Sequence, residues 1–297
     1  MRDFDYAAPC TLTDALTLMA GQSGARPLAG GTDLIDHVRT GRLTPDLLVD
    51  VKKLPELNRL EVTTGGLRLG AAVPCWKIIA SPEIARDYAA LVDSCRIIGG
   101  IQIQNRASVG GNLCNSGPAA DSIPSLIVLG ARCVIANNSG TREVPVEAFC
   151  TGPGKNVLRP GELLVELKFP ARASHSGSHF RRFIPRNEMD IAVVGVAASV
   201  TLDASGERVT DACIALGAVG PTPLLAAEAA KVLIGQTFSD EAVAKSVAAA
   251  KAIATPISDM RGTAEYRTHL VGVLVARVLK AAVARARGQT VDYQPGH

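Results

Sequence analysis

The stretch R-A-S-V-G-G-N-L-C-N-S-G-P-A-A-D, residues 106–121, decides the interpretation of this chain. It holds three glycines, two serines and two asparagines. Adjacent glycines such as Gly110 and Gly111 reach positive φ cheaply and can point consecutive backbone amides into one concavity, a geometry that holds a phosphate. The composition therefore predicts a loop whose backbone is approached closely by a ligand.

A second stretch with a similar signature, P-L-A-G-G-T-D at residues 27–33, lies far upstream in the chain. Two such cradles suit a ligand with two linked phosphates, so we interpret them as halves of one dinucleotide site. Neither stretch has the Lys and Ser/Thr of a P-loop or the G-x-G-x-x-G of a Rossmann turn. The alternative is that each Gly-Gly pair only makes a tight turn or a close packing contact.

The overall composition is that of a folded protein with more than one domain. The chain has 297 residues, of which 47% are hydrophobic and 20% charged, and this length predicts two or three domains. The net charge is +3 and there is no basic block that could follow a phosphate backbone, so we expect no nucleic acid partner. Asp3 and Asp5 at the acidic start, and the lack of an apolar run of about 20 residues, predict a cytoplasmic protein with no membrane span.

The seven cysteines are scattered along the chain and include no C-x-x-C pair. This spacing argues against a disulfide framework, a zinc site or an iron-sulfur cluster in this chain, so we expect no metal ligands. Free cysteines usually pack as small hydrophobic residues. Cys114 lies inside the central stretch, and for this residue a packing role and a reactive role both stay open.

The pattern of the first half surrounds both glycine stretches with regular elements. The first stretch should follow a strand at 26–29 and precede a helix at 33–40, a context in which loop amides and a helix start share an anion. Thr13 is the expected N-cap of an earlier helix, and Pro82 should begin one helix that reaches Ile98. The other elements expected here are strands at 46–51, 66–73, 132–136, 141–145 and 162–169 and a helix at 125–129.

The second half changes character after a Ser- and Ala-rich linker at 171–177. Strands at 179–184, 192–202 and 210–217 should form a three-stranded antiparallel sheet. Helices at 224–234, 240–253 and 263–287 should cover one face of that sheet. Strands followed by helices predict an α+β domain separate from the first half.

Six ordered motifs give the chain a specific resemblance over nearly its whole length. They are A-G-G-T-D-L at 29–34, I-Q-N-R-A-S-V-G-G-N at 103–112, S-G-P-A-A-D at 116–121, L-R-P-G-E at 158–162, M-D-I-A at 189–192 and G-A-V-G-P-T-P at 217–223. Together they resemble the FAD-binding medium subunit of the molybdenum hydroxylases, the family that includes xanthine dehydrogenase and carbon monoxide dehydrogenase. Six motifs in order make chance a poor explanation.

The resemblance implies an α+β fold with a two-part FAD-binding domain of the vanillyl-alcohol oxidase type at 1–175, with parts at about 1–55 and 56–175. A C-terminal domain at 176–297 would cover the flavin. Some members of the family carry an added loop with four cysteines that hold an iron-sulfur cluster. Cys114 is the one cysteine between residues 112 and 131, so we expect no such cluster here.

The resemblance also implies an oxidoreductase function shared among subunits. A large molybdopterin-binding subunit would hydroxylate the substrate, and two-iron two-sulfur clusters in a small subunit would carry the electrons to FAD in this chain. The acceptor would be NAD, oxygen or a quinone. The implied assembly is a heterohexamer, a dimer of heterotrimers.

The resemblance further implies which residues bind FAD. The backbone of both glycine stretches would hold the pyrophosphate, Asp121 would make a polar contact, and Ile98 and Leu164 would make apolar contacts. Arg182 stands where many members carry Lys, and the two cations hydrogen-bond differently, so the family role transfers less directly there. The expected cofactor-binding residues are Leu28, Ala29, Gly30, Gly31, Thr32, Asp33, Leu34, Ile98, Ser108, Val109, Gly110, Gly111, Asn112, Asp121, Leu164, Arg182 and Ile191, with Arg186 and Asp190 close by.

Several of these residues also have a purely structural explanation. Asp121 is a preferred N-cap type before a helix, Ile98 and Leu164 fit an apolar core, and Arg182 with Arg181 fits a solvated strand. No catalytic residue is expected. Two rival functions stay open: a stand-alone flavin oxidoreductase, which would need its own acid/base group, and a flavin-free assembly scaffold.

Overall fold

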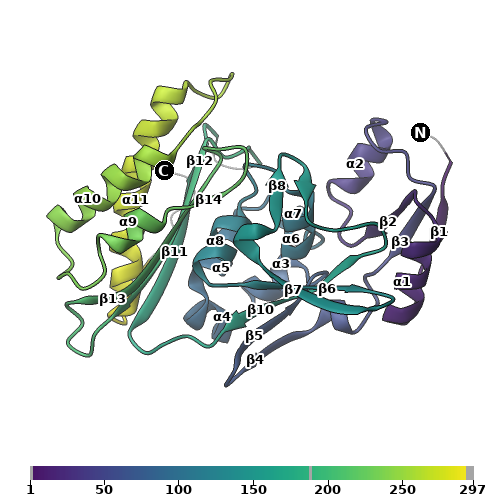
Figure 1. Cartoon of the computed structure of the whole chain (residues 1–297), viewed down its shortest axis with the longest axis horizontal. Coiled ribbons are helices and arrows are strands. Elements are labelled where there is room, and N and C mark those ends of the chain that lie inside the picture. Colours follow the sequence, from purple (N-terminus) through teal and green to yellow (C-terminus); the bar gives the residue numbers. More distant parts are fainter. Residues whose placement is uncertain (1–2, 187–188, 292–297) are drawn as a thin grey trace.

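The structure, a computed structural model, describes residues 3–186 and 189–291. Figure 1 shows three bodies that follow one another from right to left in chain order. Each body is built on its own β-sheet, and the middle body lies between the other two. Within the described residues, no helix is both long enough and apolar enough to cross a membrane.

The N-terminal body is a sheet of three parallel strands in the order β1-β3-β2. The central strand β3 is buried along its whole length, as expected for a strand covered on both faces. Thr11 caps α1, because its Oγ1 accepts from the Asp14 amide at 3.1 Å. The expected cap at Thr13 is therefore wrong. The elements are β1 (Asp5–Ala7), α1 (Leu12–Gly21), β2 (Ala25–Leu28), α2 (Leu34–Arg39) and β3 (Leu47–Asp50).

The middle body is built on a five-stranded antiparallel sheet in the order β4-β5-β10-β6-β7. Its strands are β4 (Leu60–Thr63), β5 (Gly66–Gly70), β6 (Arg132–Asn137), β7 (Gly140–Pro145) and β10 (Leu163–Pro170), with the short pair β8 (Cys150–Gly152) and β9 (Lys155–Asn156) apart from them. Its helices are η1 (Glu56–Asn58), α3 (Cys75–Ile79), α4 (Pro82–Asp87), α5 (Ala89–Arg96), α6 (Ile101–Gln104), α7 (Val109–Asn115), α8 (Ser122–Val128) and η2 (Val146–Ala148).

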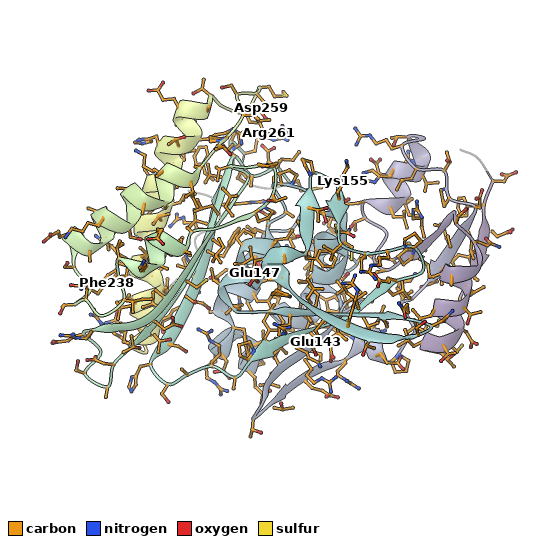
Figure 2. All side chains as sticks on the ribbon, in the orientation of Figure 1. Glu143, Glu147, Lys155, Phe238, Asp259 and Arg261 are labelled. Carbon is orange, nitrogen blue, oxygen red and sulfur yellow. The ribbon has the colours of Figure 1, made fainter. Side chains whose placement is uncertain are left out.

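Alternating side chains divide this sheet into an apolar face and a charged face. Leu69, Leu167 and Cys133 are paired across three strands and are buried in the core with the helices. The neighbouring positions carry charge instead, and Glu143 pairs there with Arg132 at 3.0 Å and Lys168 at 2.7 Å. Figure 2 labels Glu143 on this sheet, away from Asp259 and Arg261 at the end of the C-terminal body.

The C-terminal body is an antiparallel sheet in the order β11-β12-β13-β14. Its strands are β11 (Ser176–Phe183), β12 (Val194–Leu202), β13 (Val209–Gly217) and β14 (Leu224–Leu225), and its helices are α9 (Ala227–Lys231), α10 (Asp240–Ile253) and α11 (Ala264–Ala286). The sheet contains the three expected strands and a fourth strand, the two-residue β14, at its edge. The expected limits of α10 are confirmed, and Ser239 caps this helix by accepting from the Ala242 amide.

Both faces of the C-terminal sheet are covered. Helices α9 and α11 pack on the outer face and α10 packs on these two helices, while α5 and α8 of the middle body contact the inner face. Accordingly, Val196 and Val200 of β12 belong to the C-terminal core, whereas Ala197 belongs to the core of the middle body. The prediction that the C-terminal helices cover one face of the sheet is therefore confirmed, and the middle body covers the other face.

Two other expectations are corrected. The single helix expected from Pro82 is two helices, α4 and α5, because the backbone leaves the helical region at Tyr88 with φ −127° and ψ 46°. The stretch at 106–121, expected as a loop, contains helix α7.

Candidate functional site

The two glycine stretches lie against each other. A Cβ added to Gly30 would lie 2.0 Å from the carbonyl oxygen of Arg106. In return, Arg106 Nε donates to the carbonyl oxygen of Gly30 at 3.2 Å. Glycine is therefore required at position 30 by the close approach of two backbone segments that are distant in sequence.

The first stretch has the geometry that its composition predicts. Gly31 has a φ of +78°, in the region that favours glycine. The amides of Gly30, Gly31 and Thr32 donate no hydrogen bond to any residue within 3–186 and 189–291. All three residues are half-buried. Consecutive unpaired amides in a turn form a concavity suited to an anion.

The second stretch does not have the backbone conformation that its glycines predicted. Gly110 and Gly111 lie in the first turn of α7 and do not have positive φ. Ser108 is the N-cap, and its Oγ accepts from the Gly111 amide at 3.1 Å. Gly110 is required for packing, since a Cβ there would lie 2.4 Å from the carbonyl oxygen of Ala71. A serine three residues before Gly111 is the capping signal that could have predicted this helix.

Asn112 joins α7 to the start of α8. Its Oδ1 accepts from the Ser122 hydroxyl at 2.6 Å and from the Ser122 amide at 3.3 Å. This contact fixes the backbone next to Asp121. Asp121 occupies the N-cap position of α8, but its side chain makes no capping hydrogen bond, so capping does not explain the residue.

Asp121 instead pairs with Arg182 of the C-terminal sheet. Arg182 Nη1 lies 2.5 Å from Asp121 Oδ2, and the two side chains are only 5% and 11% exposed. Asp121 Oδ1 and Arg182 Nε are buried and find no hydrogen-bond partner among the described residues. Burial raises the pKa of Asp121 to about 7, although Arg182 acts to lower it. The pair thus has buried hydrogen-bonding capacity that the protein alone leaves unused.

The remaining expected residues are less closely gathered. Leu164 lies on β10 inside the core of the middle body, and Ile98 is half-buried against the same core. Ile191 is exposed, and Arg186 pairs with Asp190 at 3.2 Å between Nε and Oδ2. Leu28 ends β2, Ala29 and Asp33 belong to the following turn, Leu34 begins α2, and Val109 begins α7.

Cys114 is half-buried on α7 and packs against the core of the middle body. Burial raises the pKa of its thiol to about 12. Since the thiolate is the reactive form, this favours the packing role over the reactive one. In the part of the chain that the structure describes, no group of three or more His, Cys, Asp or Glu side chains is placed to hold a metal ion.

The arrangement fits FAD on two observations. Unpaired amides beside Gly30 and Gly31 suit a pyrophosphate, and the orphaned atoms of Asp121 and Arg182 suit further polar groups of a bound ligand. Arg68 and Arg267 also have a buried Nε without a hydrogen bond among the described residues, so the unpartnered oxygen of Asp121 is the stronger of the two indications of a missing partner.

Two family models cover most of the chain. The FAD binding domain in molybdopterin dehydrogenase matches residues 2–172. The CO dehydrogenase flavoprotein C-terminal domain matches residues 179–282.

Similar proteins extend along the full chain. The putative xanthine dehydrogenase FAD-binding subunit of Escherichia coli strain K12 is 34% identical, with 96% of this chain and 99% of that protein covered. The carbon monoxide dehydrogenase medium chain of Afipia carboxidovorans is 35% identical, with 96% and 98% covered. In the solved carbon monoxide dehydrogenase from Hydrogenophaga pseudoflava, a chain superposes with a TM-score of 0.91 at 32% identity, with 96% of this chain and 98% of that chain covered.

The resemblance predicted from the six motifs is confirmed by matches that cover the first and second halves of the chain separately and by relatives that cover both. The chain belongs to the family of FAD-binding medium subunits of the molybdenum hydroxylases.

Proposed function

We propose that this chain is the electron-transfer subunit of a molybdenum-containing hydroxylase and holds its FAD where the two glycine stretches meet. The observation that carries the proposal is the contact of Gly30 with Arg106, which places a turn of unpaired amides beside the start of α7. In this arrangement the amides of Gly30, Gly31 and Thr32 hold the pyrophosphate. Bound FAD supplies the redox chemistry, accepting electrons from an iron-sulfur subunit and giving them to an external acceptor.

The protein residues position the cofactor and set its surroundings. Ser108 fixes the first turn of α7, and Asn112 fixes the backbone next to Asp121. Asp121 and Arg182 offer one acceptor atom and one donor atom to polar groups of FAD, and their burial excludes water from that contact. We further propose that Ile98, Leu164 and Ile191 contribute apolar contacts. No side chain of this chain acts as a nucleophile in the proposal.

The names of two relatives, a carbon monoxide dehydrogenase medium chain and a 6-hydroxypseudooxynicotine dehydrogenase complex subunit, support a multi-subunit assembly, which we propose to be as follows. The partners are a large molybdopterin-binding subunit and a small iron-sulfur subunit, assembled as a dimer of heterotrimers in the cytoplasm. We divide the chain into an FAD-binding domain at 1–175 and a C-terminal domain at 176–297. The acceptor is NAD, oxygen or a quinone.

Substitution of Gly30 tests the site. Gly30→Ala introduces a Cβ 2.0 Å from the Arg106 carbonyl oxygen, so the two stretches must separate. We expect FAD affinity to fall at least about tenfold, equivalent to 1.4 kcal/mol, as measured by flavin absorbance and fluorescence during titration with FAD.

Gly21→Ala is the matched control, because a Cβ at Gly21 meets no atom within 4 Å. Circular dichroism of both variants separates lost binding from lost folding. Full FAD binding by a folded Gly30→Ala variant would contradict the proposed site.

The flavin-free scaffold is the rival function, and the unpaired amides at Gly30 to Thr32 count against it. Absorbance of the protein purified from its native host decides between them. Flavin bands in stoichiometric amount support the proposal, and colourless protein that refuses added FAD supports the scaffold.

A further inference from the structure

A cavity of about 340 Å³ lies away from the proposed FAD site. Its wall contains Thr63 at the end of β4, Asp87 at the end of α4, and Arg172 and Ser174 in the linker that leads to the C-terminal sheet. Neither glycine stretch contributes to the wall, and Asp121 and Arg182 do not. The cavity is therefore a separate feature at the junction of the middle and C-terminal bodies.

Arg172 is the unusual residue in this wall. It is half-buried, and its Nε is buried without a hydrogen-bond partner among the described residues. Burial lowers the pKa of Arg172, and the electrostatic effects of Tyr88, Asp211 and Asp87 act to raise it. Within residues 3–186 and 189–291, Arg172 forms no ion pair.

Four other arginines with restricted exposure have a carboxylate partner. Arg142 pairs with Glu162, Arg182 with Asp121, Arg267 with Asp259 and Arg285 with Asp93. A desolvated guanidinium without such a partner is costly, because its lost hydration is not repaid. Arg172 departs from the pattern that the same chain follows elsewhere.

Two carboxylates, Asp211 and Asp87, attract Arg172 without forming an ion pair with it. Arg86 also lines the cavity, but its Nε and Nη2 lie 2.8 and 2.7 Å from the two carboxylate oxygens of Asp87, so these two charges cancel. The hydroxyl of Ser176 donates to the Ala173 carbonyl at 2.6 Å and is already used. The Ser174 hydroxyl makes no hydrogen bond to the described residues and remains a second donor.

We propose that this cavity binds a small oxyanion of the phosphate type, held by the Arg172 guanidinium with the Ser174 hydroxyl as second donor. The planar fork of arginine matches two oxygens of such an anion. The charged groups in the wall, Arg86, Asp87 and Arg172, sum to +1, and the nearby Asp211 reduces the local positive charge further, so a singly charged anion is favoured over a dianion. The bound anion would join the linker to the corner between α4 and α5.

Thermal unfolding of the FAD-loaded protein tests the proposal, because bound FAD fills its own phosphate site. Inorganic phosphate is titrated at constant ionic strength, with chloride as the reference anion. Wild type should show a saturable rise in Tm of about 5 °C at a phosphate concentration near 100 times Kd. Arg172→Gln should abolish the rise.

Arg132→Gln is the matched control, since Arg132 is an exposed arginine paired with Glu143 outside the cavity. This variant should keep the full response. Phosphorus NMR line broadening on wild-type protein measures binding directly, and Ser174→Ala should weaken it several-fold. Equal responses to phosphate and chloride, no line broadening, or an unchanged response in Arg172→Gln would each overturn the proposal. Titration with acetate distinguishes a phosphate site from one for carboxylates.

Discussion

Two buried Asp–Arg pairs join the middle body to the C-terminal body, and they differ in how completely they are satisfied. Asp93 on α5 accepts from Arg285 at 2.5 and 3.0 Å and from the Phe180 amide at 3.2 Å, and His179 Nδ1 lies 2.8 Å from its Oδ2. Asp121 pairs with Arg182 through one oxygen, and its other oxygen has no partner in the described chain.

The pKa values of the two aspartates are shifted in opposite directions, although burial acts to raise both. Burial acts to raise the pKa of Asp93, but contacts with His179 and Arg285 outweigh it and hold the pKa below its usual value. Burial raises the pKa of Asp121 to about 7, and Arg182 alone does not offset it. Both carboxylate oxygens of Asp93 have hydrogen-bond partners within the protein, so Asp93–Arg285 is the finished pair. The second has the incomplete bonding expected where a ligand supplies the remaining partners.

The largest expected effect comes from breaking the finished pair. Asp93→Asn should destabilise the protein by about 3–5 kcal/mol, because it leaves the Arg285 charge buried and poorly compensated. Urea unfolding followed by circular dichroism measures the loss. Lys245→Met, which removes an exposed helix pair with Glu241, is the control and should leave stability unchanged. Equal stability of Asp93→Asn and wild type would show that the contacts to Asp93 add nothing.

Breaking the incomplete pair should cost less stability and more binding. Asp121→Asn replaces a carboxyl group that is only half satisfied, so we expect a loss of about 1–2 kcal/mol in the FAD-free protein at pH 4, where a pKa of about 7 keeps Asp121 protonated. The FAD affinity of the Asp121→Asn variant should fall. The folded fraction of the Asp93→Asn variant should keep the FAD affinity of wild type. Parallel FAD titrations of the two variants test this crossed pattern. A larger affinity loss in Asp93→Asn than in Asp121→Asn would reverse the roles assigned here.

The pH dependence of stability should differ in sign between the two aspartates. Asp121 has a raised folded pKa, so its contribution is present below pH 3.8 and is lost as pH rises toward 7. Asp93 has a lowered folded pKa, so its contribution is present above pH 3.8 and is lost as pH falls below it. In FAD-free protein, the free energy of unfolding of Asp121→Asn should rise relative to that of wild type as pH rises from 4 to 7, by at most about 1.4 kcal/mol per pH unit. A flat difference across that range would refute the assignment.

The smallest effect is expected for Arg182→Lys. The ammonium can still pair with Asp121 but lacks the guanidinium fork. We expect a stability change below about 1 kcal/mol and a two- to threefold change in FAD affinity, measured by the same titration. Arg182→Met, which removes the charge, should have a clearly larger effect on both. If Lys and Met behave alike, the positive charge is not the property that matters.

Local sequence signals predicted much of the fold and part of the site. Capping by Ser239 and the apolar spacing that follows gave α10 its limits. The Gly30–Gly31 turn was predictable because positive φ at Gly31 is a property of a short segment. The family motifs predicted the identity of the cofactor. The same Gly-Gly signal misled at Gly110 and Gly111, where Ser108 starts a helix and the glycines serve packing.

By itself, the sequence determined the glycine turn, most helix and strand positions, and the family. The tertiary structure alone decided that Asp121 meets Arg182, that Gly30 meets Arg106, and that the inner face of the C-terminal sheet is buried. That face carries small residues, such as Gly195 and Ala197, which give no hydrophobic period and reveal their role only when α8 packs against them. Pairing and burial of this kind depend on how whole bodies pack, and no local segment encodes that.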